Sequence, residues 1–239
     1  MLVLGIETST PQSSVALGTQ EGVLAAALLS RGKGHESFLA PAIRYLLDQA
    51  GLSPSAVRGV AVDLGPGLFT GMRVGIATGK AFAQALALPM VGVSSLDLLA
   101  FQARHCSSLI CACIDGRRKE VFAAFYRQVP GGVQRETDFA VLTPARLAAD
   151  IAARKERVLV VGNGVLAYRE VFESLGRQVE LGGGTRAFPD AMALVELAMP
   201  KFLREEFQRP TDVRAVYLRR ADAEINWERH RGIGAGPRG

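Results

Sequence analysis

Acidic and hydroxyl side chains stand where three apolar runs end, and such positions can do chemistry. Glu7, Thr8 and Ser9 close the first run, Asp63 closes a run in the first half of the chain, and Asp115 closes one in the second half. A carboxylate at a strand end can hold a metal or act as an acid or base, and a hydroxyl there can meet a phosphate. Most polar strand ends are solvated turns, so the residues alone leave both interpretations open.

The motifs of several large enzyme classes are incomplete in this chain. A phosphate-binding loop would need glycine where Val74 stands and a hydroxyl where Ala81 stands. The glycines of 65–71 are spaced one residue too widely for a dinucleotide fingerprint, and 92–96 lacks the second glycine of a nucleophile elbow. The histidines form no HExxH or HxxxH pair and the cysteines no zinc spacing; they are His35, His105, His230, Cys106, Cys111 and Cys113.

A ridge of small residues marks the segment after Asp63. Gly71, Gly75 and Gly79 recur at every fourth position, which places them on one face of a helix. Each interior glycine costs a helix ~1 kcal/mol relative to alanine, so the spacing indicates a close approach to the backbone. The approaching element is either the protein's own sheet or first helix, or another subunit. Similarly, 65–67 is either a tight turn or an anion-binding helix start.

The elements that must position these residues follow an α/β order. Strands are predicted at 2–7, 13–17, 23–29 and 57–62, with helices over about 37–50 and 70–87. A strand, strand, strand, helix, strand order then repeats in the second half, with single strands predicted at 109–114, 121–126, 133–142 and 158–161. We therefore predict two related lobes, 1–100 and 101–225, and a disordered glycine-rich tail at 226–239.

Composition limits the classes of protein to which this chain can belong, but it does not indicate a function. The chain has 239 residues, of which 49% are hydrophobic, and 28 basic against 23 acidic side chains give a net charge of +5. No apolar run is long enough to span a membrane and no secretory signal opens the chain, so a cytoplasmic protein is expected. The basic cluster Arg117-Arg118-Lys119 is more often a solvated hairpin end than an RNA site.

Several blocks, taken together and in this order, resemble the bacterial TsaB (YeaZ) family. They are Gly5-Ile6-Glu7-Thr8-Ser9-Thr10, the segment 65–75 (GPGLFTGMRVG), Gly92-Val93-Ser94-Ser95-Leu96, the segment 114–121 (IDGRRKEV), Tyr217-Leu218-Arg219-Arg220, and Asp222-Ala223-Glu224. The resemblance covers nearly the whole chain except the tail. Each block alone has little specificity, whereas their combination is highly specific.

The resemblance implies an actin/Hsp70-like ATPase (ASKHA) fold made of two RNase H-like lobes, each a mixed sheet flanked by helices. It implies a non-catalytic subunit of the machinery that makes threonylcarbamoyladenosine (t6A) in tRNA. The partners would be the catalytic subunit TsaD and the ATPase TsaE, which would supply ATP and a divalent metal, while this chain needs no cofactor and meets tRNA only through the complex. TsaD carries an HxxxH metal pair, which this chain lacks.

The resemblance also implies an interface on the two long helices, with a homodimer in the absence of a partner. The expected interface residues are Leu39, Ile43, Leu46, Gly71, Met72, Gly75, Ile76, Gly79 and Phe82. The resemblance therefore favours the interpretation in which the glycine ridge faces another subunit. The apolar stripe Leu39, Ile43 and Leu46 is expected to face water in a free monomer, where it would favour self-association.

An ATP-dependent small-molecule kinase of the same fold is the alternative function. It would use Asp115 or Asp63 as the base and would place Thr8 and Ser9 near a phosphate. Nucleotide-binding residues would accordingly be Thr8, Ser9 and Asp115. The kinase also needs a glycine-rich loop for adenosine in the second lobe, for which 162–164 and 182–184 are the candidates, neither of them convincing.

Overall fold

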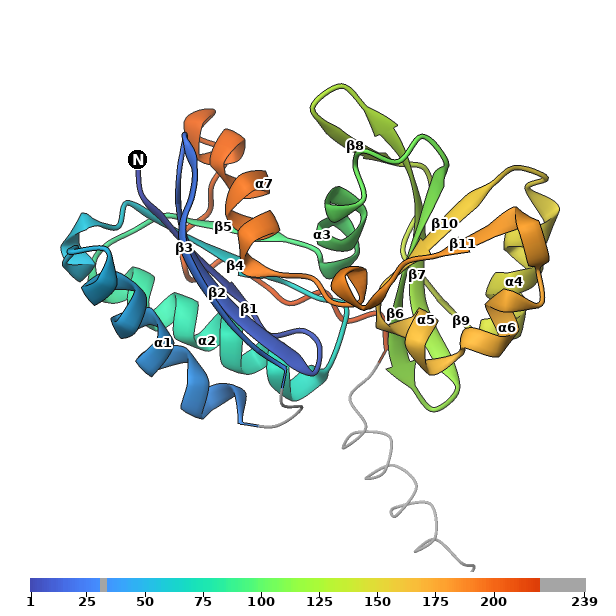
Figure 1. The fold of residues 1–239 in the computed structure, drawn as a ribbon. Coiled ribbons are helices and arrows are strands. Elements are labelled where there is room, and N and C mark those ends of the chain that lie inside the picture. Colours follow the sequence, from blue (N-terminus) through green and yellow to red (C-terminus); the bar gives the residue numbers. More distant parts are fainter. Residues whose placement is uncertain (31–33, 220–239) are drawn as a thin grey trace, which may run out of the picture.

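Two sheets with the same strand order form the two lobes of the protein (Figure 1). The computed structural model describes residues 1–30 and 34–219. In the first sheet the order is β3-β2-β1-β4-β5, antiparallel among the first three strands and parallel from β1 onward. The strands are β1 (Val3–Glu7), β2 (Gln12–Thr19), β3 (Gly22–Ser30), β4 (Gly59–Asp63) and β5 (Met90–Val93).

The second sheet repeats this arrangement in the order β8-β7-β6-β10-β11, with β9 paired to β7. Its strands are β6 (Leu109–Arg117), β7 (Glu120–Val129), β8 (Gly132–Arg135), β9 (Ala140–Leu142), β10 (Val158–Val161) and β11 (Val179–Leu181). The predicted duplicated α/β order is therefore confirmed. The single strand predicted at 133–142 is wrong, because the Thr137 hydroxyl accepts the Phe125 N–H at 3.0 Å and interrupts the ladder between β8 and β9.

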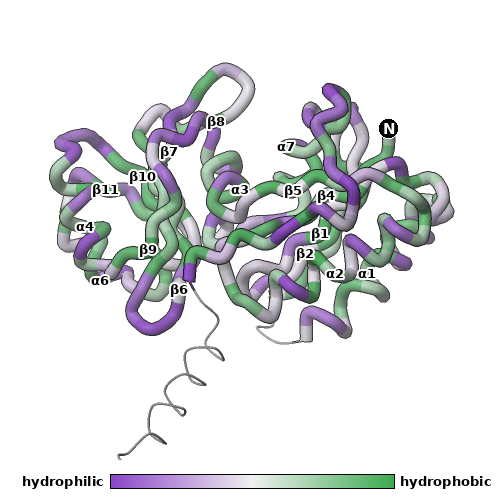
Figure 2. The backbone as a smooth tube through the Cα atoms, turned by 180° about the vertical axis from the view of Figure 1, so that it is seen from behind, coloured by the Kyte–Doolittle hydropathy of each residue, from purple (hydrophilic) through white to green (hydrophobic). Residues whose placement is uncertain are grey.

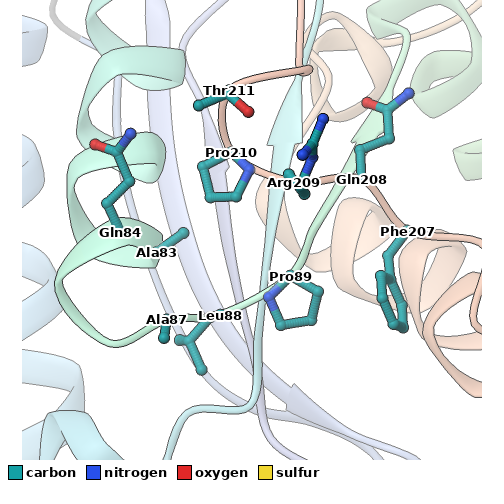
Figure 3. A pocket seen from close by; sticks show the side chains of 10 residues that line it. All are labelled: Ala83, Gln84, Ala87, Leu88, Pro89, Phe207, Gln208, Arg209, Pro210 and Thr211. Carbon is teal, nitrogen blue, oxygen red and sulfur yellow. The ribbon is translucent and has the colours of Figure 1, made fainter.

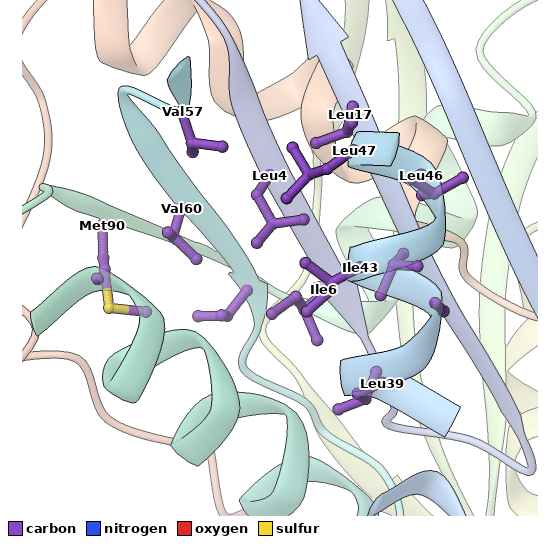
Figure 4. Close-up of a cluster of buried hydrophobic side chains, with 14 of the residues drawn as sticks. Leu4, Ile6, Leu17, Leu39, Ile43, Leu46, Leu47, Val57, Val60 and Met90 are labelled. Atoms are coloured by element: carbon purple, nitrogen blue, oxygen red, sulfur yellow. The ribbon is translucent and has the colours of Figure 1, made fainter. Parts of the chain in front are cut away.

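Two helices cover one face of the first sheet, and a third covers the other. They are α1 (His35–Gln49) and α2 (Phe69–Ala85) on the first face and α7 (Ala191–Leu203) opposite (Figure 1). The apolar positions of α1 recur at helical spacing and pack over β2, in one cluster with apolar residues of β1 and β4 (Figure 4). Both long helices lie within two residues of their predicted bounds, although α1 begins at His35 rather than at Ser37.

The apolar stripe of α1 belongs to the core of the monomer. Leu39, Ile43 and Leu46 are only 1%, 6% and 3% exposed and pack in one cluster with Leu4 and Ile6 (Figure 4). The expectation that this stripe faces water, or a partner, is therefore wrong. A helix that covers a sheet needs the same apolar spacing as one that meets another subunit, so the pattern could not distinguish the two.

The glycine ridge of α2 likewise faces the protein's own sheet. A Cβ atom on Gly71 would overlap the Thr8 carbonyl oxygen, one on Gly75 would overlap Thr8 Oγ1, and one on Gly79 would lie 2.5 Å from Val62. The glycines let the helix backbone approach the ends of β1 and β4. Of the two explanations left open by the spacing, packing inside the monomer is the correct one.

The other expected interface residues of α2 are also turned inward. Met72 and Ile76 are buried, and Phe82 is half-buried against the same core. None of the three offers its side chain fully to a partner. If α1 and α2 meet another protein, they do so through the opposite, exposed side of each helix.

Shorter helices complete both lobes. The helix α3 (Ser95–Gln102) packs against β6 and also against α7, and so joins the lobes. On the second sheet, apolar contacts from α4, α5 and α6 cover the other face. The bounds are α4 (Pro144–Ala153), α5 (Asn163–Ala167), α6 (Arg169–Glu173) and the 3₁₀ turns Pro54–Ala56, Gly176–Gln178 and Gly184–Arg186.

The predicted extent of the second lobe is wrong at its C-terminal end. The helix α7 packs on β1 and β2, Gln208 pairs with Met90 of β5, and Val213 joins the core cluster of the first lobe. Residues 191–216 therefore return to the first lobe. The apolar face of the first sheet opposite α1 requires a cover, and the N-terminal third of the chain offers no further helix for it. The predicted disordered tail at 226–239 lies outside the described residues.

None of the helices in the described part of the chain combines the length and the apolar character that crossing a membrane requires.

The close contact between α2 and β1 predicts the effect of a single added methyl group. We expect Gly71→Ala to lower the free energy of unfolding by ~1–3 kcal/mol, because the new Cβ meets backbone that cannot yield, despite a gain of ~1 kcal/mol in helix propensity. Urea unfolding followed by circular dichroism measures the change. Ala81→Leu, on the exposed side of α2, is the matched control and should stay within ~0.5 kcal/mol of the wild type. Equal stability of Gly71→Ala and wild type would contradict the packing described.

Candidate functional site

Two acidic side chains meet inside the first lobe at the ends of neighbouring strands. In the parallel pair β1 and β4, Ile6 lies opposite Val62, so the next residues, Glu7 and Asp63, come side by side. They are 0% and 4% exposed. Two buried carboxyls at one sheet edge are costly in their charged forms unless hydrogen bonds and protons compensate. The sequence showed both acids at strand ends but gave no sign of their burial.

Hydroxyl groups surround the Glu7 carboxylate. Its Oε1 accepts the Ser9 N–H at 2.7 Å and the Ser9 hydroxyl at 2.8 Å, while Oε2 accepts the Ser14 hydroxyl at 3.3 Å. The Ser14 oxygen in turn accepts the Ala191 N–H at 2.9 Å. Glu7 thereby connects β1 and β2 to the first turn of α7. The role of Ser14 could not be read from the sequence, because its partners are remote along the chain.

The Asp63 carboxylate holds the loop that follows β4. Its Oδ1 accepts the Gly65 N–H and the Ser95 hydroxyl, both at 2.7 Å, whereas Oδ2 has no hydrogen-bond partner in the described residues. Burial raises the pKa of Asp63 to about 6, and burial together with the nearby Asp63 charge raises the pKa of Glu7 well above its usual value. The pair therefore retains a proton far above the pH at which free carboxyls ionise.

The hydroxyls expected near a phosphate are used inside the protein. The Thr8 hydroxyl donates to the Gly71 carbonyl at 2.8 Å, and the Ser9 carbonyl accepts the Leu68 N–H at 2.6 Å. Thr8 and Ser9 are 2% and 1% exposed, and a Cβ on Gly67 would overlap the Ser9 carbonyl. The first turn of α2 and the loop before it therefore cover both residues. Thr8 and Ser9 do not present a nucleotide site in this structure.

Asp115 lies in the second lobe, on β6, among local partners. Its N–H donates to Asn163 Oδ1 at 3.0 Å, and its Oδ1 accepts the Arg117 N–H at 2.9 Å and the Tyr168 hydroxyl at 3.4 Å. The Arg117 guanidinium lies 3.7 Å from its Oδ2. These bonds join β6 to α5 and to the turn that follows. They give Asp115 a structural task, and its assignment to nucleotide binding gains no support.

The candidate adenosine loop at 162–164 is also filled. Cβ atoms on Gly162 and Gly164 would overlap the carbonyl oxygen and the sulfur of Cys113, so the loop packs directly on β6. The second candidate differs, since Gly183 and Gly184 have open space around their Cα atoms. Open space around two glycines does not by itself make a binding site for an adenine base. Among residues 1–30 and 34–219, no three His, Cys, Asp or Glu side chains gather closely enough to hold a metal ion.

A groove of about 670 Å³ lies beside the C-terminal end of α2, between that helix and the returning segment 207–211 (Figure 3). Ala83, Leu88 and Phe207 contribute apolar walls, and Arg209, which pairs with Asp212 at 2.9 Å, lies at its edge. Sequence analysis missed this groove because its two sides are more than a hundred positions apart.

The outer sides of α1 and α2 form a second exposed feature, which we term the outer helical face. It comprises Ala40, Pro41, Arg44, Tyr45, Asp48, Thr70, Arg73, Ala77, Ala81, Gln84 and Ala85. Tyr45 is 59% exposed, and Ala77, Ala81 and Ala85 follow one another at every fourth position of α2. Small side chains in this pattern allow another helix to come close.

These features define a class of protein: a two-lobed α/β protein whose two sheets repeat one strand order, with the polar end of β1 covered by its own helix α2. Residues 23–227 match a family model described as TsaD, tRNA N6-adenosine threonylcarbamoyltransferase. The chain is 28% identical to TsaB of Bacillus subtilis, covering 95% of this chain and 98% of that protein, and 29% identical to TsaB of Escherichia coli, covering 92% and 95%.

A solved structure agrees with these sequence relatives. YeaZ from Pseudomonas aeruginosa superimposes with a TM-score of 0.79 and 32% identity, over 91% of this chain and 99% of that one. The chain belongs to the TsaB (YeaZ) family, within the wider family that the TsaD model describes. The resemblance read from the sequence blocks, and the fold it implied, are confirmed.

The buried acid pair predicts how stability depends on pH. Because the pKa of Asp63 is raised to about 6 in the folded protein, the folded state binds a proton that the unfolded chain has already lost between about pH 4 and 6. The stability that this group contributes is present below pH ~4 and is lost as the pH rises through about 6. Wild-type protein should therefore lose up to about 3 kcal/mol from this group between pH 4 and 8.

Asp63→Asn should remove the part of the slope that Asp63 contributes and leave the part due to the raised pKa of Glu7, since the amide keeps an acceptor oxygen for Gly65 and Ser95 and carries no charge. Urea unfolding at pH 4, 6 and 8 tests it. Asp48→Asn, at an exposed position of α1, is the matched control and should leave the slope unchanged. The same pH dependence in both variants would show that Asp63 titrates normally.

Proposed function

We propose that the chain acts in t6A biosynthesis as a non-catalytic subunit that binds a TsaD-like catalytic subunit together with a TsaE-like ATPase. The proposal is carried by one observation in the first lobe, namely that the polar groups of Thr8 and Ser9 already have partners inside the protein. The Thr8 hydroxyl donates to α2, the Ser9 hydroxyl donates to Glu7, and the Ser9 carbonyl accepts the Leu68 N–H. A lobe filled in this way can fold and bind a partner, but it does not hold a phosphate. ATP and a divalent metal would then belong to the partners.

The outer helical face is the proposed site for the TsaD-like subunit. It replaces the buried residues that the sequence indicated, and it lies on the same two helices. Its alanines allow close helix packing, and Tyr45 offers an aromatic side chain of the kind that often contributes most to binding energy. The same face would support a homodimer when no partner is present, in the cytoplasm where tRNA is modified.

The small-molecule kinase has less support. Its candidate base Asp63 is buried and holds the 65–67 loop, its phosphate-binding hydroxyls are occupied, and the loop at 162–164 is filled by Cys113. These three groups are therefore committed to folding. The other candidate base, Asp115, accepts hydrogen bonds from Arg117 and Tyr168, and the other candidate loop, 182–184, keeps open space at Gly183 and Gly184.

The outer helical face predicts a variant that separates binding from folding. We expect Ala77→Arg to lower affinity for the TsaD-like subunit at least 10-fold, because a long charged side chain would hold the facing helix away. The melting temperature should change little, since Ala77 is exposed. Isothermal titration with the purified partner and t6A formation in a reconstituted mixture measure the effect. Ala152→Arg, at an exposed position of α4, is the control. Full affinity in Ala77→Arg would exclude this part of the face.

A second prediction concerns catalysis by the isolated chain. We expect the purified protein, incubated with ATP and Mg²⁺, to release phosphate no faster than a blank. If it does turn over ATP and Asp115→Ala abolishes the rate, then the chain is an enzyme and the proposed non-catalytic role is wrong.

A further inference from the structure

The strand β3 forms an outer edge of the first sheet. It pairs antiparallel with β2, in regular register from Ala25 to Ser30, and within residues 1–30 and 34–219 no strand lies along its other side. An edge strand presents N–H and C=O groups to which another strand can add. Because β3 is nine residues long, it offers a long row of such groups.

The other sheet edges are short or covered, which are two of the ways in which natural proteins prevent strands from adding. At the opposite edge of the first sheet, Met90 of β5 exchanges backbone hydrogen bonds of 2.9 and 2.8 Å with Gln208. In the second sheet, the edge strands β8, β9 and β11 are four, three and three residues long, and β8 and β11 carry Arg135 and Glu180. In the described part of the chain, β3 is thus the one long edge strand without a charged residue or a proline.

Large apolar side chains of β3 are exposed to solvent. Leu24 and Leu28 are 53% and 55% exposed, and Val23 and Leu29 are exposed as well. These four are among only eleven large hydrophobic side chains that are exposed in the described structure, so exposed apolar surface is concentrated on this strand. Apolar side chains that gather on one surface indicate contact with another molecule.

The helices of the first lobe lie over the two faces of its sheet. Figure 2 shows α1 and α2 on one side of the sheet and α7 on the other, as Figure 1 does from the front. Ala27 packs against the core on the α1 side. Ala26 and Leu28 are opposite Ala16 and Ser14, which face α7, and both nevertheless remain exposed. The helices therefore leave the α7 side of β3 uncovered.

The sequence of β3 is complementary to itself when two copies run antiparallel. A pair centred on Ala27 places Ala26 of one copy opposite Leu28 of the other. Ala25 then lies opposite Leu29, so that each large side chain meets a small one. Because β3 has no charged residue, two copies meet without repulsion between like charges. A two-fold axis through the pair repeats each of these contacts.

Pairing through β3 joins two sheets and then stops. Five strands from each copy would form one continuous sheet of ten, which is within the range of natural open sheets. Both outer strands of that sheet would be β5, where Gln208 already occupies the edge. An interface of one strand per copy is small beside the ~800 Å² per partner of a stable complex, so such a dimer should dissociate on dilution.

We propose that two copies of this chain dimerise by antiparallel pairing of their β3 strands. A charged peptide strand would find no opposite charge on β3, whereas a second copy supplies an equally long, uncharged and apolar strand. The inference goes beyond the proposed function, because it concerns a second copy of the chain and uses no residue of the outer helical face. The TsaD-like subunit and the second copy would therefore bind through different residues.

Sedimentation equilibrium of the full chain at several concentrations tests the pairing. The Ala77→Arg variant, in which the outer helical face is blocked, should still form dimers. Adding Leu28→Lys to it should weaken dimerisation about 10-fold or more, because a lysine on an edge strand opposes pairing. The melting temperature should stay the same, since Leu28 is exposed. The matched control Leu166→Lys, on α5, replaces a leucine that is 47% exposed and should leave the dimer unchanged.

Disulfide trapping tests which strands meet. Ala26→Cys and Leu28→Cys are made in separate chains that also carry Cys106→Ser, so that the remaining native thiols are buried. Residues directly opposite each other in an antiparallel pair have Cβ atoms ~4.5–5.5 Å apart, close to the ~3.5–4.5 Å of a disulfide. A mixture of the two chains should therefore form a disulfide-linked dimer on mild oxidation.

A dimer that Leu28→Lys weakens, together with the mixed disulfide, supports the inference. An undiminished dimer in Leu28→Lys or the absence of the mixed disulfide overturns it. A strict monomer in Ala77→Arg also overturns it, and would assign self-association to the outer helical face. Capture of a TsaD-like subunit by the wild-type chain tests the proposed function separately. Its failure would overturn that function and leave the result for the dimer unchanged.

Discussion

The close approach of α2 to the end of β1 is the contact on which the rest of the first lobe depends. Without Cβ atoms at Gly67, Gly71 and Gly75, the helix can lie directly on Thr8 and Ser9 and exchange hydrogen bonds with them. That contact covers Thr8 and Ser9, buries the inner side of α2 and leaves its alanine-rich outer side as the exposed surface. A single set of glycines thus determines which side of α2 is buried and which side is exposed.

The buried acids extend this constraint to the rest of the chain. Glu7 reaches α7 through Ser14, and Asp63 reaches α3 through Ser95. Hydroxyl and N–H donors satisfy three of the four carboxylate oxygens in the described structure, and a retained proton lowers the cost of burying the pair. Polar groups, rather than apolar packing alone, therefore fix how α3 and α7 meet the first sheet.

Much of the fold could be predicted from the sequence, because apolar periodicity reports secondary structure directly. The repeated strand order and both long helices emerged in this way. The direction in which a helix turns its apolar or small residues could not be predicted: Leu39 and Gly75 would show the same spacing against a sheet or a subunit. The candidate site could be predicted only in part, for a similar reason. The partners of the two buried acids reach them through tertiary contacts that spacing does not encode; they are Ser14, Ser95 and Ala191 around Glu7 and Asp63.

The return of 191–216 to the first lobe has a consequence for synthesis of the protein. The face of the first sheet that α7 covers carries Val3, Ala16, Ala61 and Val91, all of them made before the second lobe begins. At roughly 5–20 residues per second, a ribosome needs roughly 5–20 s to pass from the end of β5 to the start of α7. During that interval the nascent first lobe has an uncovered apolar face, so this lobe can reach its native state only after the second lobe has been translated.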